Sequence, residues 1–159
     1  MKKLFSVLLP TVLILLSTST AFAAGKPERL YAPLPQPLVV SGSCAFDVDV
    51  TVIRNNEYTT NFYDANGNLV RQLVNGALVV ALTNLQNGHS ITVNVSGPGY
   101  LTFNADGTIL QKTEGQSALF FPGAFWLTSG RFDVLFSPGA DPVLVRSSGN
   151  RQDVCAMLA

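Results

Sequence analysis

The sequence predicts an all-β protein whose antiparallel meander closes into a small β-barrel, with a two-sheet β-sandwich as the alternative. Three observations predict the class. Apolar and polar residues alternate with a period of two from Cys44 onward, and turn sequences rich in Gly, Asn and Asp recur roughly every eight to twelve residues. No stretch after the N-terminal segment has a helical repeat. A meander of so many twisted strands must close or fold over to remove its edges, and we expect closure.

The first strand shows the alternation most clearly. Phe46, Val48 and Val50 alternate with Asp47 and Asp49, which is typical of a half-buried strand whose aspartates face water. Paired carboxylates can also share acid and base work or hold calcium, but the alternation favours a solvated face. Further strands are expected at 57–63, 69–74, 77–82, 89–96, 100–104, 108–113, 118–121, 125–128, 131–136 and 143–146, with a short helical turn at 153–158.

Turn residues separate these strands and predict that sequential strands pair. Asp64-Ala65-Asn66-Gly67 and Ala105-Asp106-Gly107 are hairpin signals, and Asn75-Gly76 is expected to begin another tight turn. The start of a calcium-binding loop has a similar spacing to that of Asp64, Asn66 and Asn68. That loop needs Gly at its sixth position and an acidic residue at its twelfth, where this chain has Leu and Asn, so we predict no metal site there.

The N-terminal segment predicts export. Lys2 and Lys3 precede an apolar run of about thirteen residues, and Ala21-Phe22-Ala23 forms a small-residue cleavage pattern. The run is too short to span a bilayer as a helix, so a signal peptide over 1–23, cleaved between Ala23 and Ala24, is preferred to a retained anchor. We therefore expect a secreted, extracytoplasmic protein that does not associate with a membrane after processing.

The mature chain divides into an arm and one domain. Four prolines punctuate residues 24–43, which excludes a helix or a central strand and favours an extended, polyproline-like arm. The arm is interpreted as a spacer, with a recognition motif as the alternative and with its 38–40 segment laid on the domain as one arrangement. Residues 44–159 are expected to form a single β domain, since 136 mature residues are too few for two.

The two cysteines, Cys44 and Cys155, are predicted to form a disulfide. An even count in an oxidising compartment favours pairing, and only one pairing exists. The bridge would join the first strand to the last residues and suits a barrel, in which these strands lie side by side, although a sandwich also permits it. A free catalytic thiol is the alternative, and the export signal and the lone histidine argue against it.

Charge and composition limit the classes of molecule that the protein is expected to bind. Loss of Lys2 and Lys3 leaves eight cationic and ten acidic residues, a formal charge of about −2, and the remaining arginines are scattered. Nucleic acid and anionic membranes are therefore poor partners. The polar surface is rich in Ser, Thr, Asn and Gln, which leaves self-association and surface-polymer binding open. We expect no cofactor.

The turn and terminal motifs also carry a resemblance. Residues 44–48 (CAFDV) and 153–156 (DVCA), with 64–68, 82–85, 95–99 and 130–132 between them, make the chain similar to a group of uncharacterised exported bacterial small all-β proteins. The resemblance would cover most of the mature domain. It implies the all-β fold and export, and it implies no activity and no functional residue.

Two function classes remain. His89 is the only histidine, and it shares parity with Ile91 and Val93, which would aim it into a barrel; the preferred interpretation is a turn-adjacent ring in water. A small barrel enzyme of the isomerase, cyclase or hydrolase type would use His89 with a carboxylate such as Asp133 as acid and base. The other hypothesis is a non-catalytic binding or surface-interaction module, and it is favoured because no nucleophile motif or metal-ligand cluster is present.

Some strands have more apolar side chains than one buried face can take. Residues 77–82, 120–121, 125–126 and 132–136 are apolar on both faces or nearly so. The excess needs cover from the arm, from a second sheet or from another molecule, and we prefer cover from within the chain. Tyr58, Tyr63, Tyr100 and Trp126 could supply stacking surface, and we expect an interior packed with Phe, Val and Leu rather than a hollow one.

Overall fold

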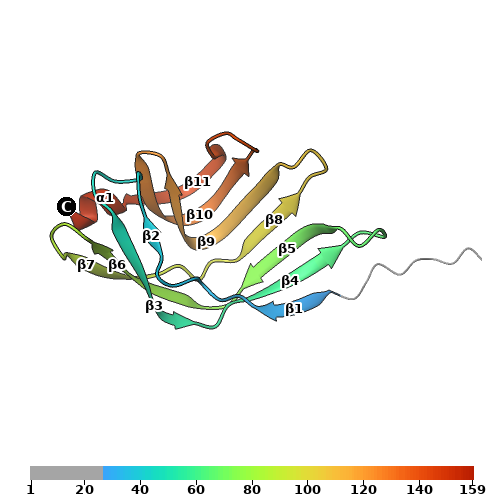
Figure 1. The fold of residues 1–159 in the computed structure, drawn as a ribbon, viewed down its shortest axis with the longest axis horizontal. Helices are drawn as coiled ribbons and strands as arrows, with labels where there is room; N and C mark the ends of the chain where they lie inside the picture. Colours follow the sequence, from blue (N-terminus) through green and yellow to red (C-terminus); the bar gives the residue numbers. More distant parts are fainter. Residues whose placement is uncertain (1–26) are drawn as a thin grey trace, which may run out of the picture.

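The computed structural model describes residues 27–159 and confirms the all-β class. The predicted signal peptide, residues 1–23, lies outside the described residues. The strands are β1 (Glu28–Tyr31), β2 (Val39–Val40), β3 (Val48–Asn55), β4 (Tyr58–Tyr63), β5 (Leu69–Asn75), β6 (Leu78–Asn84), β7 (Ser90–Asn94), β8 (Gly99–Phe103), β9 (Ile109–Phe121), β10 (Ala124–Phe136) and β11 (Val143–Asp153), followed by helix α1 (Val154–Leu158) (Figure 1).

The strands form two antiparallel sheets, which corrects the expectation of a closed barrel. One sheet has seven strands in the order β1-β4-β5-β8-β9-β10-β11, and the other has four in the order β2-β3-β6-β7. Among the described residues β1, β11, β2 and β7 each have a strand on one side only, whereas a closed barrel leaves no such edge. The two-sheet alternative therefore describes the molecule better.

The chain changes sheet where the sequence predicted a hairpin turn. β5 and β6 do not pair, and Gly76 between them carries the chain from the seven-stranded to the four-stranded sheet. This crossing packs tightly against the opposite crossing from β3 to β4. Asn56 N donates to Ala77 O at 2.8 Å, and a Cβ on Gly76 would lie 2.4 Å from Asn56 O. A turn sequence shows where the chain bends but not which strand it meets next. The single continuous meander that we expected is therefore wrong, although β4–β5, β8–β9, β9–β10 and β10–β11 pair in sequence order as predicted.

A row of three glycines bends the seven-stranded sheet. The expected strands 108–113 and 118–121 are one strand, β9, and 125–128 and 131–136 are likewise β10. Gly115, Gly130 and Gly149 are direct neighbours across β9, β10 and β11, and each has a positive φ. Figure 1 shows the three strands curving along their length. Inside the bend Leu119 of β9 packs with Phe132 and Val134 of β10, which lie on the other side of the row of glycines.

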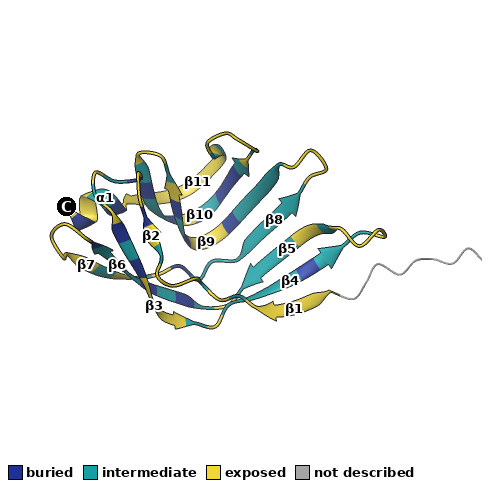
Figure 2. Ribbon diagram, viewed as in Figure 1, coloured by how far each residue is buried: buried dark blue, intermediate teal, exposed yellow. Residues whose placement is uncertain are grey.

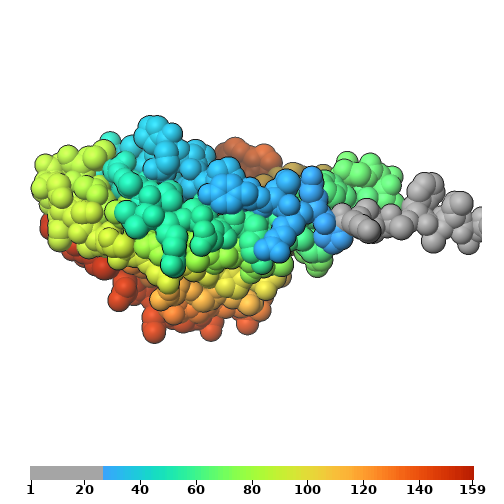
Figure 3. Space-filling view, turned by 90° about the horizontal axis from the view of Figure 1, so that it is seen from below, coloured from blue at the N-terminus to red at the C-terminus, as the bar shows by residue number. Residues whose placement is uncertain are grey.

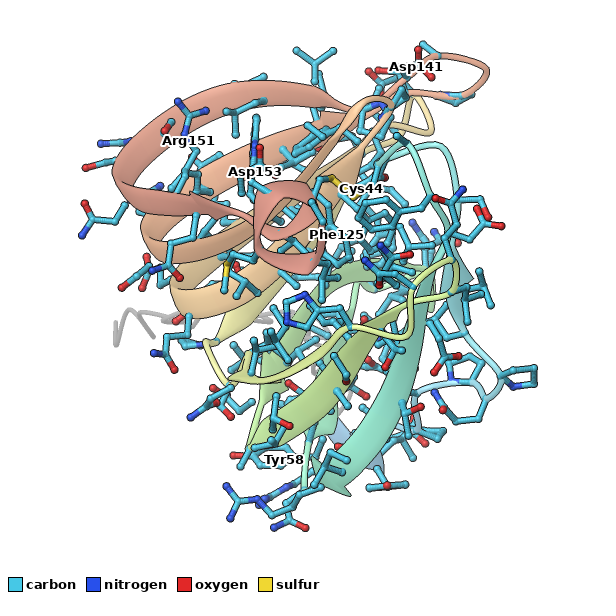
Figure 4. All side chains as sticks on the ribbon, turned by 90° about the vertical axis from the view of Figure 1, so that its left-hand side faces the viewer. Cys44, Tyr58, Phe125, Asp141, Arg151 and Asp153 are labelled. Carbon is cyan, nitrogen blue, oxygen red and sulfur yellow. A yellow bond between two sulfur atoms is a disulfide. The ribbon has the colours of Figure 1, made fainter. Side chains whose placement is uncertain are left out.

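The main core lies between the two sheets. Its buried members from the four-stranded sheet include Val48, Val80 and Leu82, and they meet Phe125 of β10 and Leu158 of α1. Figure 2 shows buried positions on both layers where they approach each other, and Figure 4 shows Phe125 between the sheets. The alternation predicted for residues 46–50 at the start of β3 is confirmed, because Val48 and Val50 are buried while Asp47 is exposed.

The Pro-rich arm lies on the domain in its described part. β1 pairs with β4 and β2 pairs with β3, both at sheet edges, and the prolines of the arm lie outside these two short strands. Leu34 and Leu38 pack against the main core, and Figure 3 shows this N-terminal segment lying across the surface of the strands. Part of the apolar excess is therefore covered from within the chain, as expected.

The predicted disulfide and the terminal helical turn are both confirmed. Cys44 and Cys155 are bonded, with a Cα–Cα distance of 5.4 Å and 111 positions between them. Asp153 caps α1 by accepting hydrogen bonds from the backbone amides of Cys155 and Ala156. Figure 4 shows Cys44 beside this helix. The bridge fixes the C-terminal turn against the start of the four-stranded sheet.

Candidate functional site

The structure does not bring His89 and Asp133 together. His89 is exposed in the loop before β7, and its backbone amide donates to Asn87 Oδ1 at 2.8 Å, as the preferred interpretation of a turn-adjacent ring required. Asp133 is buried on β10 in the other sheet, where Arg131 Nε lies 3.2 Å from its Oδ1. Asp133 raises the pKa of the Arg131 guanidinium by accepting its hydrogen bonds and by charge attraction. Arg131 and Asp133 thus form a structural ion pair, and His89 is not placed to act with Asp133 as acid and base.

The other candidate carboxylates are explained by local structure. Asp49 accepts a hydrogen bond from Thr51 Oγ1 at 2.7 Å on the outer face of β3. Asp64 accepts from the side-chain and backbone amides of Asn68 and from the backbone of Asn66, which closes the β4–β5 hairpin and lowers the pKa of Asp64. Within residues 27–159 no three His, Cys, Asp or Glu side chains gather in a way that could hold a metal ion.

Two open hollows lie beside the buried core of Val, Leu and Phe side chains, so the packed interior that we expected is present only in part. A cavity of about 260 Å³, here called the core cavity, lies between the two sheets. A second cavity of about 310 Å³, here called the rim cavity, lies between the bend of β9 and β10 and the 41–43 loop. The two cavities share three wall residues on β9, namely Gln111, Ala118 and Phe120, so they adjoin.

Small residues in the walls explain why the space is not filled. Ala118 stands where β9 faces the four-stranded sheet, and the same cavity is lined by Gly97, just before β8, and by Gly99, the first residue of β8. Gly97 cannot be larger, because a Cβ there would lie 2.3 Å from Gln116 O. The bulky side chains around them reach across the gap without closing it; these include Leu34, Leu38, Val50, Val74, Leu78, Leu82, Val95, Leu101 and Phe125.

Phe120 stands at the junction of the two cavities. Its side chain is 55% exposed although it is aromatic, and its ring meets Phe125 edge-on with the centroids 6.1 Å apart. An aromatic residue with so much exposure at an apolar opening is suited to contact a bound apolar group. The rim cavity continues past it to Leu119, Phe121, Val134 and Phe136.

The polar groups in the walls are few, and all of those on β9 are neutral. Thr113 Oγ1 donates to Phe132 O at 3.3 Å, and Ser117 Oγ lies 2.7 Å from Thr128 Oγ1, so both hydroxyls already have partners. The amide of Gln111 makes no hydrogen bond with any described residue, and it borders both cavities. Among residues 27–159, no Asp, Glu, Lys, Arg or His lines either cavity. The walls can therefore hold apolar matter and offer one free amide, but no acid or base.

The sequence contained a signal for part of this site. Residues 120–121 and 132–136 have apolar side chains on both faces of a strand, and the structure places Phe120, Phe121, Val134 and Phe136 around the rim cavity. Gln111 and Ala118 carried no signal, because their role depends on the width of the gap between the sheets.

Comparisons with protein-family models, with curated proteins and with solved structures found no match to this chain. The resemblance to exported bacterial β proteins therefore stays a prediction. No helix in the described part of the chain has the length and apolar character needed to cross a membrane.

Proposed function

We propose that this protein is a non-catalytic, extracytoplasmic binding module that holds an uncharged apolar molecule, such as an alkyl or acyl chain, in the core and rim cavities. The observation that carries the proposal is a pair of adjoining cavities of about 260 and 310 Å³ whose walls are apolar and uncharged. Ligand sites are commonly apolar hollows of about this size with a few polar groups that fix orientation.

The arrangement of polar groups suggests how such a ligand would lie. The alkyl part occupies the space between the sheets, and a hydroxyl, ester or amide group meets the free amide of Gln111. A charged head group would have no counter-ion in the walls, and burying it unpaired would be costly. We therefore expect neutral chains to bind more tightly than the matching carboxylates.

The expected affinity follows from the area that the chain buries. Each CH₂ taken out of water contributes about 0.8 kcal/mol, so a ten-carbon chain contributes about 8 kcal/mol. Because about 8 kcal/mol alone corresponds to about 1 μM and immobilising the ligand opposes this gain, the dissociation constant should lie between about 1 μM and about 1 mM.

The export part of the proposal is supported by the Cys44–Cys155 bridge, since disulfides persist in oxidising compartments. Mass spectrometry of the processed protein should find an N-terminus at or within a few residues of Ala24. A retained Met1 in membrane fractions would contradict export.

Fluorescence titration with the neutral apolar probe N-phenyl-1-naphthylamine tests the binding site. Ala118→Leu should fill the junction of the cavities and weaken probe binding about tenfold or more. Ala81→Leu makes the same change on β6 at a residue that lines neither cavity, and it should bind the probe as the unchanged protein does. Equal binding by both variants would place the probe elsewhere and refute the site. Displacement by decan-1-ol but not by decanoate at equal concentration would support the neutral preference.

A further inference from the structure

β7 is an edge strand without the usual protection against pairing. Its sequence, SITVN, has no charged residue and no proline, and its register with β6 is continuous. The other edges in the described part of the chain are protected in recognised ways. β1 has Glu28 and Arg29, β2 has only two residues, and β11 has a register shift together with Arg146 and Arg151.

The backbone groups on the outer side of β7 are free to pair. Two hydrogen bonds of 2.9 Å flank β7, from Val95 N to Leu78 O and from Asn84 N to His89 O, and each joins a residue next to β7 to an end of β6. In an antiparallel ladder alternate residues bond to the same neighbour. The odd-numbered residues of β7 therefore bond to β6, and the even-numbered ones direct N–H and C=O toward the free edge; these are Ser90, Thr92 and Asn94.

A recess of about 350 Å³ lies beside this free edge. From the four-stranded sheet it is lined by Val93 and Asn94 of β7 and by no residue of β6 or β3. Its opposite wall is the face of β9, β10 and β11 that extends beyond β7. On the same face, Ala118 lies two residues after Gln116 and Leu127 lies two residues before Ser129, and both pack against the main core. The seven-stranded sheet thus projects past the end of the four-stranded sheet and overhangs the edge of β7.

The overhanging face carries neutral amide and hydroxyl groups. Gln116, Ser129 and Asn150 are direct neighbours across β9, β10 and β11, and Gln152 lies beside Leu127 in the next row. All four are exposed, and the amides of the three Asn and Gln side chains make no hydrogen bond within residues 27–159. Each amide offers both a donor and an acceptor, which matches a peptide group.

We propose that an extended, uncharged peptide segment of another protein binds in this recess as a fifth strand beside β7. Its backbone pairs with the even-numbered residues of β7, and its side chains on one face meet Leu127 and the amides of the overhanging sheet. None of the described residues that line the recess is aromatic and able to stack on a sugar, which argues against a glycan. A second copy of this chain would bring its own overhanging sheet against the same edge, whereas a single strand needs only the recess. The apolar cavities are not needed for this interaction.

Nuclear magnetic resonance titration with a blocked heptapeptide that alternates threonine and valine tests the proposal. We expect shifts at Ser90, Thr92 and Asn94, slower exchange of the Thr92 amide hydrogen, and shifts of the Gln116 and Asn150 side-chain amides. Two further peptides carry N-methyl groups on all valines or on all threonines. Only one of these sets of N–H groups can face β7, so one peptide should lose binding and the other should retain it.

A protein variant provides the second arm. Thr92→Pro removes an N–H that faces the free edge and leaves the β6 ladder intact, so it should weaken peptide binding about tenfold or more. Thr92→Val keeps the N–H and should bind as before. The proposal fails if the peptide causes no shifts at millimolar concentration, if both N-methylated peptides bind equally, or if neutral maltohexaose shifts these residues and the peptide does not. The N-methyl comparison uses the unchanged protein and so does not depend on the folding of Thr92→Pro.

Discussion

Replacing Gly130 by alanine should severely destabilise the domain, because the bend of the seven-stranded sheet depends on this residue. Gly130 has a φ of +134°, which L side chains rarely adopt. A Cβ there would lie 2.3 Å from Ser148 O and 2.7 Å from the Cα of Gly149. Both neighbours are backbone atoms of the paired strand, so the overlap cannot be relieved by rotating a side chain.

A matched variant, Gly123→Ala, separates the expected loss of stability into backbone strain and steric overlap. Gly123, in the β9–β10 turn, has a φ of +73° and nothing within 4 Å of its added Cβ, so Gly123→Ala carries the backbone strain alone, about 1–2 kcal/mol. Gly130→Ala adds the overlap with β11, about 1–3 kcal/mol or more. We therefore expect Gly130→Ala to lower the free energy of unfolding by about 2–5 kcal/mol.

Urea denaturation followed by the fluorescence of Trp126, the one tryptophan in the sequence, measures both variants against the unchanged protein. The prediction requires Gly130→Ala to lose clearly more stability than Gly123→Ala. If the two variants unfold at the same urea concentration, β10 and β11 are not in close contact at Gly130, and our account of the bend is wrong.

Three further predictions concern the bridge and the charged side chains. Cys44→Ala should lower the free energy of unfolding by up to about 4–5 kcal/mol, because the bridge closes a long loop in the unfolded chain; reduced and oxidised protein unfolding at the same urea concentration would contradict this. Arg131→Met should cost about 1–3 kcal/mol by leaving the buried Asp133 carboxylate unpaired, and adding Asp133→Leu should restore part of that loss in the same assay. Hydrogen bonds from the side chain and backbone of Asn68 lower the pKa of Asp64 below its ordinary value of 3.8, so its ionised form stabilises the fold above that value and this contribution disappears as the pH falls through the lowered pKa. Asp64→Ala should therefore show a shallower loss of stability in acid, and an unchanged slope would count against the turn geometry.

The local parts of the fold were predictable from the sequence, and the pairing of distant parts was not. The alternation around Val48 predicts which face of β3 is buried, because successive side chains of a strand point to opposite faces of the sheet. Gly76 was misread as a hairpin turn, since a flexible residue permits both a reversal and a crossing between sheets. The sequence predicts breaks between strands at Gly115 and Gly130, yet both glycines lie within long strands as bends, and only their register with Gly149 shows this.

The candidate site was predictable to a smaller degree. Excess apolar residues such as Phe120 and Phe136 indicated a surface that needed cover, and both line the rim cavity. The cavities themselves depend on small residues at distant points in the chain: Ala118 packs against the main core, and Gly97 lies close to the backbone of β9. An alanine in a strand has no sequence signature that separates a cavity wall from a tightly packed core.

The proposed apolar site is tested most directly by nuclear Overhauser contacts between decan-1-ol and methyl-labelled valine and leucine side chains. The account predicts contacts from the alkyl protons to Val74 and Leu101, which are half-buried and line the core cavity. Val143 and Val145, which are 55% and 52% exposed on β11, serve as the control and should show none. Contacts confined to those exposed valines, or no contact at the solubility limit of decan-1-ol, would contradict the proposal that the protein binds apolar chains between its sheets.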